Sequence, residues 1–343
     1  MLVETGKIIK TYLESNNKTF DDLIKACSLS SRTLYRALNS ENKLSYEIAV
    51  GVNKLIPEIT PEFLLAYDGK YQAQKKQMEH DNGIKDINNV IKVYKVNKLY
   101  PELKDSKEDL INKAIDVFGL DNIRNNTINN SKWVYSYNFS QAKNANEFNK
   151  DLWLSSIYYD YCLVNKKTLL NENLINEAIN DIKNYCGTKD YKLTIFNMNE
   201  ICKNYGINYY FKSSIPNSRI KAVTIKDVEG YVYLFISDLF KCVENLWVSF
   251  MHEMIHIIDK DYEKSIIFDE NDRKTNEAYV SDKVGYYFIG DDYKNISDVT
   301  NKYEINEIAN KNSIPVGIVA ELWRMKTNIY NDKSINSYVH YFK

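Results

Sequence analysis

The sequence predicts an α+β protein that is mostly helical. Three observations support this: apolar residues recur at helical spacing through much of the first 190 residues, alternating β-branched and aromatic segments follow within 207–236, and helical spacing then returns. The chain of 343 residues is long for one domain. We therefore expect an all-helical domain over 1–70, a linker and helical middle region over 71–190, and a further domain over 191–343 that ends in a helical hairpin.

The first 70 residues predict short helices arranged as a helix-turn-helix. Thr19 is a candidate N-cap, with Asp21 and Asp22 in the first turn, where acidic residues interact favourably with the helix dipole. A three-residue link leads into a second helix that begins near Arg32. Two helices joined by a tight turn in an all-helical module form this motif, and Thr60 with the proline after it begins a further helix.

The middle region offers no recognisable chemistry. Residues 71–85 are polar and contain a glycine, which indicates a linker. Helices are expected over most of 86–190, whereas the stretch 121–150 is rich in asparagine and serine and is expected to be loop. The region therefore predicts a helical spacer or a dimerisation surface, and a homodimer is a candidate assembly.

The last part changes from helix to strand and back. A helix is expected to end at Gly206, and the segments INYYFKS, KAVTIKD and GYVYLFIS then favour strands. Helices are expected again at about 240–260 and 274–290, and a helical hairpin is expected around Pro315.

Composition and charge exclude several classes of protein. The net charge of −1 gives no overall basic surface for nucleic acid, and no apolar stretch approaches the roughly 18 residues of a membrane span. The first residues lack the apolar core of a signal peptide. The five cysteines never form a CxxC pair, which indicates a reducing compartment without a thiolate zinc site. We expect a cytoplasmic protein with no membrane association.

Two of the four histidines, His252 and His256, lie four residues apart in an almost wholly apolar segment. Residues with this spacing share one face of a helix, so both imidazoles can bind one metal ion. Glu253 would project beside the ion and accept a proton from bound water. Zinc with three protein ligands keeps a fourth position for this water and lowers its pKa to about 7. The alternative is two core histidines hydrogen-bonded to carbonyl groups.

Glu277 is the candidate third ligand. It begins the next apolar helix, and a carboxylate on a following antiparallel helix would complete a zinc site of two histidines and one glutamate. An exposed acid favoured by the helix dipole is the alternative. The three-histidine metalloprotease pattern is absent because Tyr262 stands six residues after His256. The fallback ligands are Glu263, Asp269, Glu270 and Asp272.

Other residues near the motif are weaker candidates. Asp259 is expected to point past the ion, and Asp282 is either a partner that orients a histidine or a surface acid. Three tyrosines are candidate donors to a transition state, with packing as the alternative: Tyr279, Tyr286 and Tyr287.

The stretch from about 195 to 290 resembles the ImmA/IrrE family of metallopeptidases. The resemblance rests on the segments YGINYYF, GYVYLFIS, WVSFMHEMIHII and NEAYVSDKVGYYF. The chain departs from the family pattern at Ile255, where glycine is usual, and at Ser281 and Asp282, which replace a small and an apolar residue.

The resemblance implies a small gluzincin-like fold, with His252, His256 and Glu277 as zinc ligands and Glu253 as the general base. Family members cleave or regulate repressor proteins in phage, mobile elements and stress responses. The resemblance therefore implies a regulatory zinc metalloendopeptidase, with a repressor or regulator encoded nearby as its protein substrate.

The segment from Thr19 to Ile56 resembles XRE/Cro-type helix-turn-helix domains, including those of HigA-like antitoxins, and TPEFLLAYDGKY after it is similar to their next element. This implies that the second helix of the motif enters the major groove of double-stranded DNA. The candidate contacts are Ser30, Ser31, Arg32, Thr33 and Arg36, with Tyr35 at a phosphate. Arg32 is the best candidate for a bidentate contact with guanine. The first 70 residues contain nine basic and nine acidic residues, so a helical scaffold without DNA is the alternative.

Two functions from different classes remain open. The first is a zinc peptidase that cleaves a partner regulator and is recruited by the helix-turn-helix. The second is a transcriptional regulator or antitoxin whose peptidase-like domain senses metal or a protein without turnover. The complete HExxH motif favours the first, for which a substrate strand is expected to add to the sheet near Tyr231–Ile236.

Overall fold

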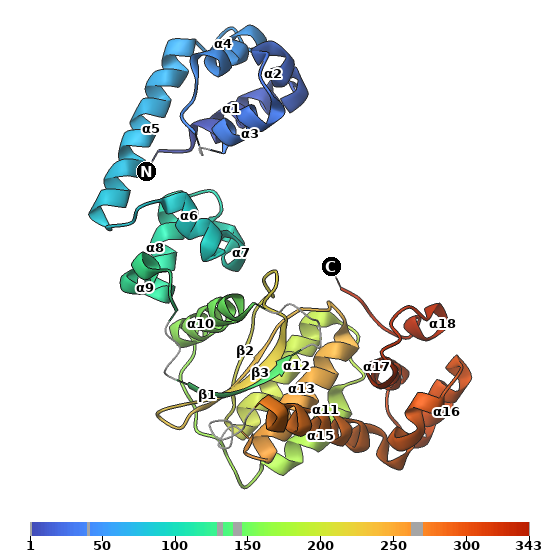
Figure 1. Ribbon diagram of the computed structural model, residues 1–343. Coiled ribbons are helices and arrows are strands. Elements are labelled where there is room, and N and C mark those ends of the chain that lie inside the picture. The colour runs from blue at the N-terminus through green and yellow to red at the C-terminus, as the bar shows by residue number, and fades with distance from the viewer. Residues whose placement is uncertain (1, 40–41, 129–132, 140–145, 262–269, 343) are drawn as a thin grey trace. The chain divides into compact units, whose positions relative to one another are not determined.

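The structure is a computed structural model that describes residues 2–39, 42–128, 133–139, 146–261 and 270–342, with only the backbone described over 133–139 and 270–275. The chain forms two compact units, Met1–Ile128 and Asn129–Lys343 (Figure 1). Helices predominate, and the second unit contains one small sheet, so the predicted α+β class is confirmed at this level. None of the helices described is both long and apolar enough to cross a membrane.

The first unit consists of helices throughout its described residues. In chain order they are α1 (Thr5–Ser15), α2 (Phe20–Cys27), α3 (Ser31–Leu38), α4 (Tyr46–Leu55), α5 (Pro61–Asp81), α6 (Ile87–Val93), α7 (Val96–Leu99), η1 (Pro101–Leu103), α8 (Lys107–Phe118) and α9 (Leu120–Asn125). Helices α2 and α3 form the expected pair with a tight turn, in which Ser28 is left-handed at φ 54°. Thr19 caps α2 in a reciprocal capping box with Asp22.

A compact core holds the first five helices together. It is formed by fully buried aliphatic residues from successive helices, such as Ile9, Leu23, Leu34 and Val52. Asp68 of α5 is buried among them and accepts hydrogen bonds from the Thr5 hydroxyl (2.9 Å) and the Leu44 amide (3.0 Å). A buried carboxylate with two donors fixes α5 against the start of the chain.

The expectation of a linker over 71–85 was wrong, because α5 continues to Asp81. The polar residues that suggested a linker include two that are buried with partners. Glu79 accepts a hydrogen bond from the Ile87 amide (3.2 Å) and lies 4.0 Å from the Lys75 ammonium group. The polar residues of this segment suggested that it is exposed to solvent. The fold instead buries Lys75 and Glu79 and places partners beside their charges.

The second unit combines a four-stranded sheet with helices. Its elements are β1 (Trp133–Phe139), α10 (Glu147–Val164), η2 (Ile175–Glu177), α11 (Ala178–Tyr185), α12 (Tyr191–Tyr205), β2 (Asn208–Phe211), β3 (Ile220–Asp227), β4 (Val232–Ile236), α13 (Val243–Ile258), α15 (Glu270–Ile289), η3 (Gly290–Asp298), α16 (Lys302–Asn312), α17 (Val316–Thr327) and α18 (Lys333–Asn336). The strands β2, β3 and β4, the left-handed Gly206 after α12 and the hairpin of α16 and α17 agree with the sequence prediction.

The strand order is β1-β3-β4-β2, in which β2 is parallel to β4 and the other neighbours are antiparallel. Two expectations are corrected here. The stretch 121–150, expected as loop, contains β1 and the start of α10. The segment Tyr231–Ile236, expected at the sheet edge, forms β4, which is internal because β3 and β2 flank it. A substrate strand therefore cannot add to β4.

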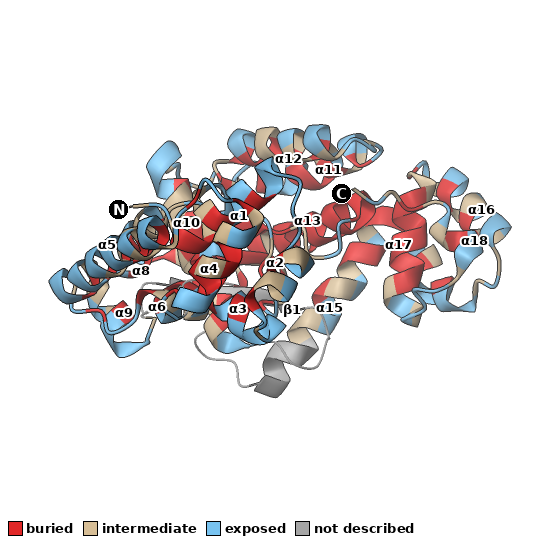
Figure 2. Cartoon of the chain, turned by 90° about the horizontal axis from the view of Figure 1, so that it is seen from above, coloured by how far each residue is buried: buried red, intermediate tan, exposed pale blue. Residues whose placement is uncertain are grey.

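Alternating side chains of β4 face helices on both sides of the sheet. Tyr233 makes edge-on ring contacts with Tyr158 (centroids 5.3 Å apart) and Tyr161 (5.5 Å) of α10. Leu234 belongs instead to the core around α13. All five β4 residues are buried, as expected for a strand covered on both faces. This packing places α13 at the centre of the unit, and Figure 2 shows it buried along nearly its whole length.

Candidate metal centre

Helix α13 carries the two clustered histidines and is buried on every side. All of its residues from Val243 to Ile257 are buried, because it lies against the sheet, α12, α15 and α17. A helix that is apolar almost all round belongs in the interior of a domain. The few polar side chains on α13 must therefore find partners inside the protein.

Three side chains from two helices converge at one point. The Nε2 atom of His256 lies 3.0 Å from Nε2 of His252, and Nε2 of His252 lies 2.9 Å from Oε2 of Glu277 on α15. The other oxygen of that carboxylate, Oε1, lies 3.4 Å from Nε2 of His256. A tetrahedral ion with bonds of about 2.0–2.1 Å separates its ligand atoms by about 3.3 Å. The two imidazoles and the carboxylate are therefore close to the spacing that a metal ion requires.

The orientation of His256 is fixed from behind by Asp261. Its Nδ1 atom lies 2.9 Å from Oδ2 of Asp261, and the Asn276 amide donates to the same oxygen (3.1 Å). An imidazole that donates its Nδ1–H to a carboxylate presents the lone pair of Nε2, which is the form that binds a metal. Asp261 was not predicted from the sequence. The available signal was an acid just beyond the motif helix, a position that usually indicates solvent.

The charge balance of this cluster favours a cation. Burial opposes a charge on His256, but hydrogen bonds to Asp261 and Glu277 outweigh it and raise the pKa of His256 to about 10. Burial also disfavours a charged Glu277, yet its bonds to both histidines lower the pKa of Glu277 to about 2. Burial lowers the pKa of His252. The carboxylates thus stabilise a positive charge on His256, at the position where a metal ion would bind.

Glu253 is the least satisfied group in the cluster. Its side chain is 0% exposed, and neither carboxylate oxygen forms a hydrogen bond of good geometry with a described residue, although the hydroxyl and backbone of Thr224 lie close enough to oppose the rise of its pKa. Burial raises the pKa of Glu253 to about 7. A carboxylate oxygen of Glu253 lies within 4.8 Å of ligand nitrogens of both histidines, so this group of three could hold a metal ion. A water molecule beside such an ion would provide the missing partner.

The other acids considered from the sequence have different positions. Asp282, considered as a partner of a histidine, instead forms an exposed ion pair with Lys326 (2.7 Å). Asp259 points away from the cluster, as expected, and pairs with Lys283 (2.6 Å). The four fallback ligands lie where no side chain is described: Glu263, Asp269, Glu270 and Asp272.

The three candidate tyrosines of α15 do not share one environment. Tyr279 and Tyr286 are 55% and 57% exposed, and the Lys283 ammonium group lies 4.8 Å from the Tyr279 ring centroid. Tyr287 packs against the core of the unit. These positions favour packing and surface contacts over the role of transition-state donor.

The candidate DNA contacts lie on the exposed face of α3. Ser31, Arg32, Thr33 and Arg36 are exposed, as is Tyr35 at 59%, whereas the core takes the other face. Ser30 is used in the N-cap, because its hydroxyl accepts a hydrogen bond from the Thr33 amide (3.1 Å). The arrangement presents a short helix with two arginines to a partner.

Comparison with family models, curated proteins and solved structures finds no match for the chain. The likeness to ImmA/IrrE peptidases and to XRE/Cro domains thus rests on the sequence motifs. The metal cluster itself rests on the geometry described above.

Proposed function

We propose that the second unit is a zinc metalloendopeptidase of the ImmA/IrrE type that cleaves a regulatory protein. The observation that carries this proposal is Glu253, a fully buried carboxylate without a well-formed hydrogen bond to a described residue, beside the converging side chains of His252, His256 and Glu277. An unpaired buried carboxylate costs stability, and a structural core would have no reason to retain it. A general base that waits for water has such a reason.

Each residue of the cluster has a distinct role in the proposed reaction. His252, His256 and Glu277 would hold zinc, which when bound polarises the peptide carbonyl and makes water acidic enough to lose a proton near neutral pH. Glu253 accepts the proton of the attacking water and then delivers it to the leaving amine. Asp261 keeps His256 in the tautomer that offers Nε2 to the metal.

The proposed substrate is an extended or locally unfolded segment of a repressor or other regulator. Because β4 is internal, a substrate strand that joins the sheet would have to add to one of its outer strands, β1 or β2. Of these two, β1 packs against α13, the helix that carries both histidines, and is therefore the candidate.

The test combines metal content with cleavage. Wild-type protein is expected to contain one zinc per chain and His256→Ala to contain none. Glu253→Gln is expected to keep its zinc and to cleave the neighbouring regulator about 10²–10⁴-fold more slowly, since general-base catalysis contributes that much. Equal zinc in wild type and His256→Ala would refute the ligand assignment, and equal cleavage by Glu253→Gln would refute catalysis at this site.

A regulator without turnover is the second candidate function. It is favoured by the closed environment of the cluster, in which the His256 side chain is 0% and the Glu277 side chain 29% exposed. In this case the cluster would sense metal, and cleavage by the zinc-loaded protein would be absent.

We further propose that α3 of the first unit contacts DNA. Loss of a bidentate base contact should cost about 1–3 kcal/mol at one position of the site, so Arg32→Ala should bind promoter DNA about 5- to 150-fold more weakly at fixed salt. Lys18→Ala, a change outside α3, serves as the control. Unchanged affinity in Arg32→Ala would favour a protein contact at this surface.

A further inference from the structure

Lys221 of β3 carries an ammonium group that has no partner among the described residues. Its side chain forms no hydrogen bond or ion pair with any of them, and it contacts the Phe240 ring, whose centroid lies 5.0 Å from Nζ. The residue is partly exposed, and Nζ is not one of the unpaired atoms that lack accessible surface. A cation–π contact leaves the positive charge without an opposite charge. An anion can therefore reach this ammonium group from outside the chain.

By regular alternation along β3, Lys221 would face away from α13. Thr224 faces this helix, because its hydroxyl donates to the Glu253 carbonyl (3.3 Å). Ile225 pairs with Tyr233, whose ring contacts α10 on the opposite side of the sheet. Successive strand residues point to opposite faces, so alternation alone would place Lys221 with Ile225 on the side of α10.

An irregularity in β3 interrupts this alternation. The register with β1 shifts by one residue, because Asn138 pairs with Ala222 while Phe139 pairs with Ile220. Lys221 is thus the extra residue of a β-bulge. Bulges redirect side chains and are over-represented next to active sites. The direction of the Lys221 side chain is therefore set by the bulge and not by the strand.

The charge of Lys221 acts on groups of the α13 side. Burial lowers the pKa of His252 on α13, and the charge of Lys221 adds to this lowering. Burial raises the pKa of Glu321 on α17, and Lys221 is one of the groups that oppose the rise. Phe240, which the ammonium group contacts, lies just before α13. The bulge therefore directs Lys221 towards the helix that carries the metal ligands.

A row of polar side chains on α13 connects the two groups that Lys221 influences. Asn245, Ser249 and His252 follow one another at intervals of four and three residues, so they share one face of the helix. Asn245 donates to Glu321 (2.7 Å) at one end, and His252 belongs to the metal cluster at the other. The Ser249 hydroxyl between them makes no hydrogen bond with a described residue. A hydroxyl and an ammonium group without partners thus lie on this side of the sheet.

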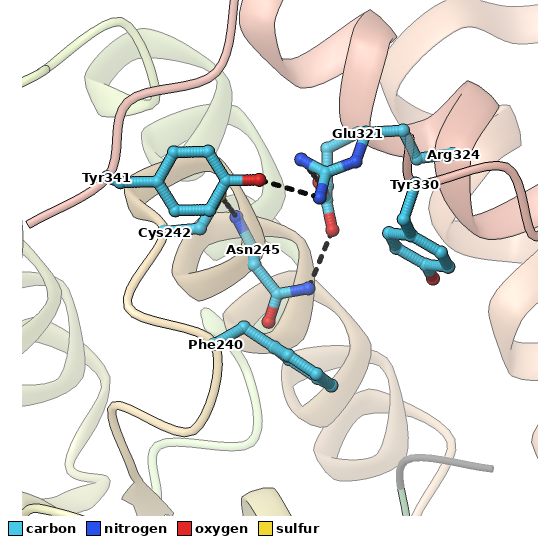
Figure 3. Close-up of a pocket in the computed structure, with 7 residues that line it drawn as sticks. All are labelled: Phe240, Cys242, Asn245, Glu321, Arg324, Tyr330 and Tyr341. Carbon is cyan, nitrogen blue, oxygen red and sulfur yellow. Dashed lines mark hydrogen bonds and ion pairs between the residues drawn. The ribbon is translucent and has the colours of Figure 1, made fainter. Parts of the chain in front are cut away.

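The acid whose charge acts on Lys221 is already paired. Glu321 and Arg324 line a pocket of about 290 Å³ between the start of α13, α17 and the C-terminal segment (Figure 3). The two residues form an ion pair (3.0 Å). Figure 3 shows the hydrogen bonds that hold this pair, from the Asn245 amide to Glu321 (2.7 Å) and from Arg324 to the Tyr341 hydroxyl (2.9 Å). The pair is balanced in charge, and the charge of Lys221 remains uncompensated.

The surroundings of Lys221 favour a ligand with a single negative charge. Burial lowers the pKa of Lys221, and Glu321 opposes this shift only in part. A charge that the protein surrounds is costly until an opposite charge pairs with it. A phosphate group carries up to two negative charges and would need further cations, whereas a carboxylate forms a charge-assisted hydrogen bond with one ammonium group.

We propose that Lys221 binds a carboxylate of the protein substrate close to the cleaved bond, and so selects substrates that carry one there. This inference rests on the proposed peptidase function for its biological meaning, but binding of the carboxylate does not require cleavage. Lys221 precedes Thr224, the neighbour of Glu253, by about 10 Å of strand. The carboxylate is therefore expected within about three residues of the cleaved bond. It belongs either to an acidic side chain or to the C-terminus of the substrate, since both present the same chemistry.

The test measures peptide binding without cleavage. The probes are three acetylated tripeptides: Ala-Glu-Ala amide with a side-chain carboxylate, Ala-Ala-Ala with a free C-terminal carboxylate, and the neutral Ala-Gln-Ala amide. They are titrated by ligand-observed NMR against the zinc-loaded full chain carrying Glu253→Gln. At least one carboxylate probe is expected to bind about 10- to 100-fold more tightly than the neutral probe, since a hydrogen bond to a charged group contributes that much. The tighter of the two carboxylate probes identifies the source of the carboxylate.

Lys221→Met, added to the same chain, should abolish this preference. Methionine keeps an unbranched side chain without the charge, and all zinc ligands remain. A carboxylate that binds zinc directly would therefore keep its preference in the variant. Lys203→Met is the matched control, because Lys203 is 62% exposed and pairs with Glu200 on α12 (2.7 Å), and it should leave the preference unchanged. Lys221→Gln repeats the test if the methionine variant does not fold.

Equal binding of the charged and neutral probes, or a preference that persists in Lys221→Met, would overturn the proposal. Neither outcome depends on cleavage. If the probes bind as expected while wild-type protein cleaves nothing, the proposed peptidase function fails and the carboxylate site remains. If wild type and Lys221→Met cleave the neighbouring regulator equally well, the peptidase function stands and the proposal for Lys221 fails.

Discussion

The metal cluster and the pocket lined by Asn245, Glu321 and Arg324 are two polar sites beside α13, and they differ in charge balance. The metal cluster combines two histidines with the carboxylates of Glu277, Asp261 and Glu253. The pocket pairs one carboxylate, Glu321, with one guanidinium, Arg324. Even with His256 protonated, the first site has an excess of carboxylates, whereas the charges of the second site are balanced.

Buried charges are stable only when something compensates them. At the metal cluster the compensation must come from outside as a cation, because the carboxylates outnumber any positive partner that the described residues provide. At the pocket the charges of Glu321 and Arg324 compensate one another, so no added ion is required.

The largest effect is expected when the balance of the pocket is broken. Arg324→Met leaves the Glu321 carboxylate buried and unpaired, which should lower the free energy of unfolding by about 3–5 kcal/mol. The double variant Arg324→Met with Glu321→Leu removes both charges and should recover most of the loss. Urea unfolding of the zinc-loaded proteins measures both values. A double variant as unstable as the single one would show that packing, and not charge balance, holds the site together.

Much of the metal cluster could be predicted from the sequence because its geometry is local. Four-residue spacing on a helix places His252 and His256 on one face, and Glu277 was expected on the next helix, where it lies inside α15, which begins at Glu270. Asp261 could not be predicted in the same way. It lies beyond the helix, where an acid usually indicates solvent, and only the fold turns it back to Nδ1 of His256.

The pocket could not be predicted, because its parts are far apart in the sequence. Asn245, Arg324 and Tyr341 meet only after α17 and the C-terminal segment pack against the start of α13. Strand β1 was missed for a related reason: its asparagine- and serine-rich surroundings indicate loop, while its pairing with β3 is a tertiary contact. Local periodicity thus predicts helices and their buried faces, whereas the pocket and the pairing of β1 depend on contacts between residues that are far apart in the sequence.

A smaller effect is expected when the metal cluster loses the group that orients it. Asp261→Asn keeps the shape but removes the carboxylate that holds the Nδ1 proton of His256, so zinc affinity should fall by about 10- to 100-fold. Competition with a zinc chelator measures this change. Asp259→Asn is the matched control, because Asp259 lies at the end of the same helix but pairs with Lys283. Equal affinities in both variants would mean that Asp261 plays no part in metal binding.

The smallest effect is the pH dependence of stability that Glu321 contributes. Burial raises the pKa of Glu321, while Arg324 and the Asn245 amide oppose the shift. The folded protein therefore holds this proton at pH values where the unfolded chain, with a glutamate pKa of about 4.3, has released it. The stability gained from the protonated form is present below that value and is lost as pH rises through the folded pKa.

Glu321→Gln removes this titration and keeps an amide of the same shape. As pH rises from 4 to 8, the free energy of unfolding of the wild type should therefore fall relative to that of the variant. The fall should be about 1.4 kcal/mol for each unit by which the pKa of Glu321 is raised. Urea titrations of both proteins at a series of pH values measure it. A shift in the opposite direction would mean that Arg324 dominates and lowers the pKa of Glu321 in the folded state. Glu321 and Arg324 would then behave as a fully ionised pair, with the carboxylate charged throughout this pH range.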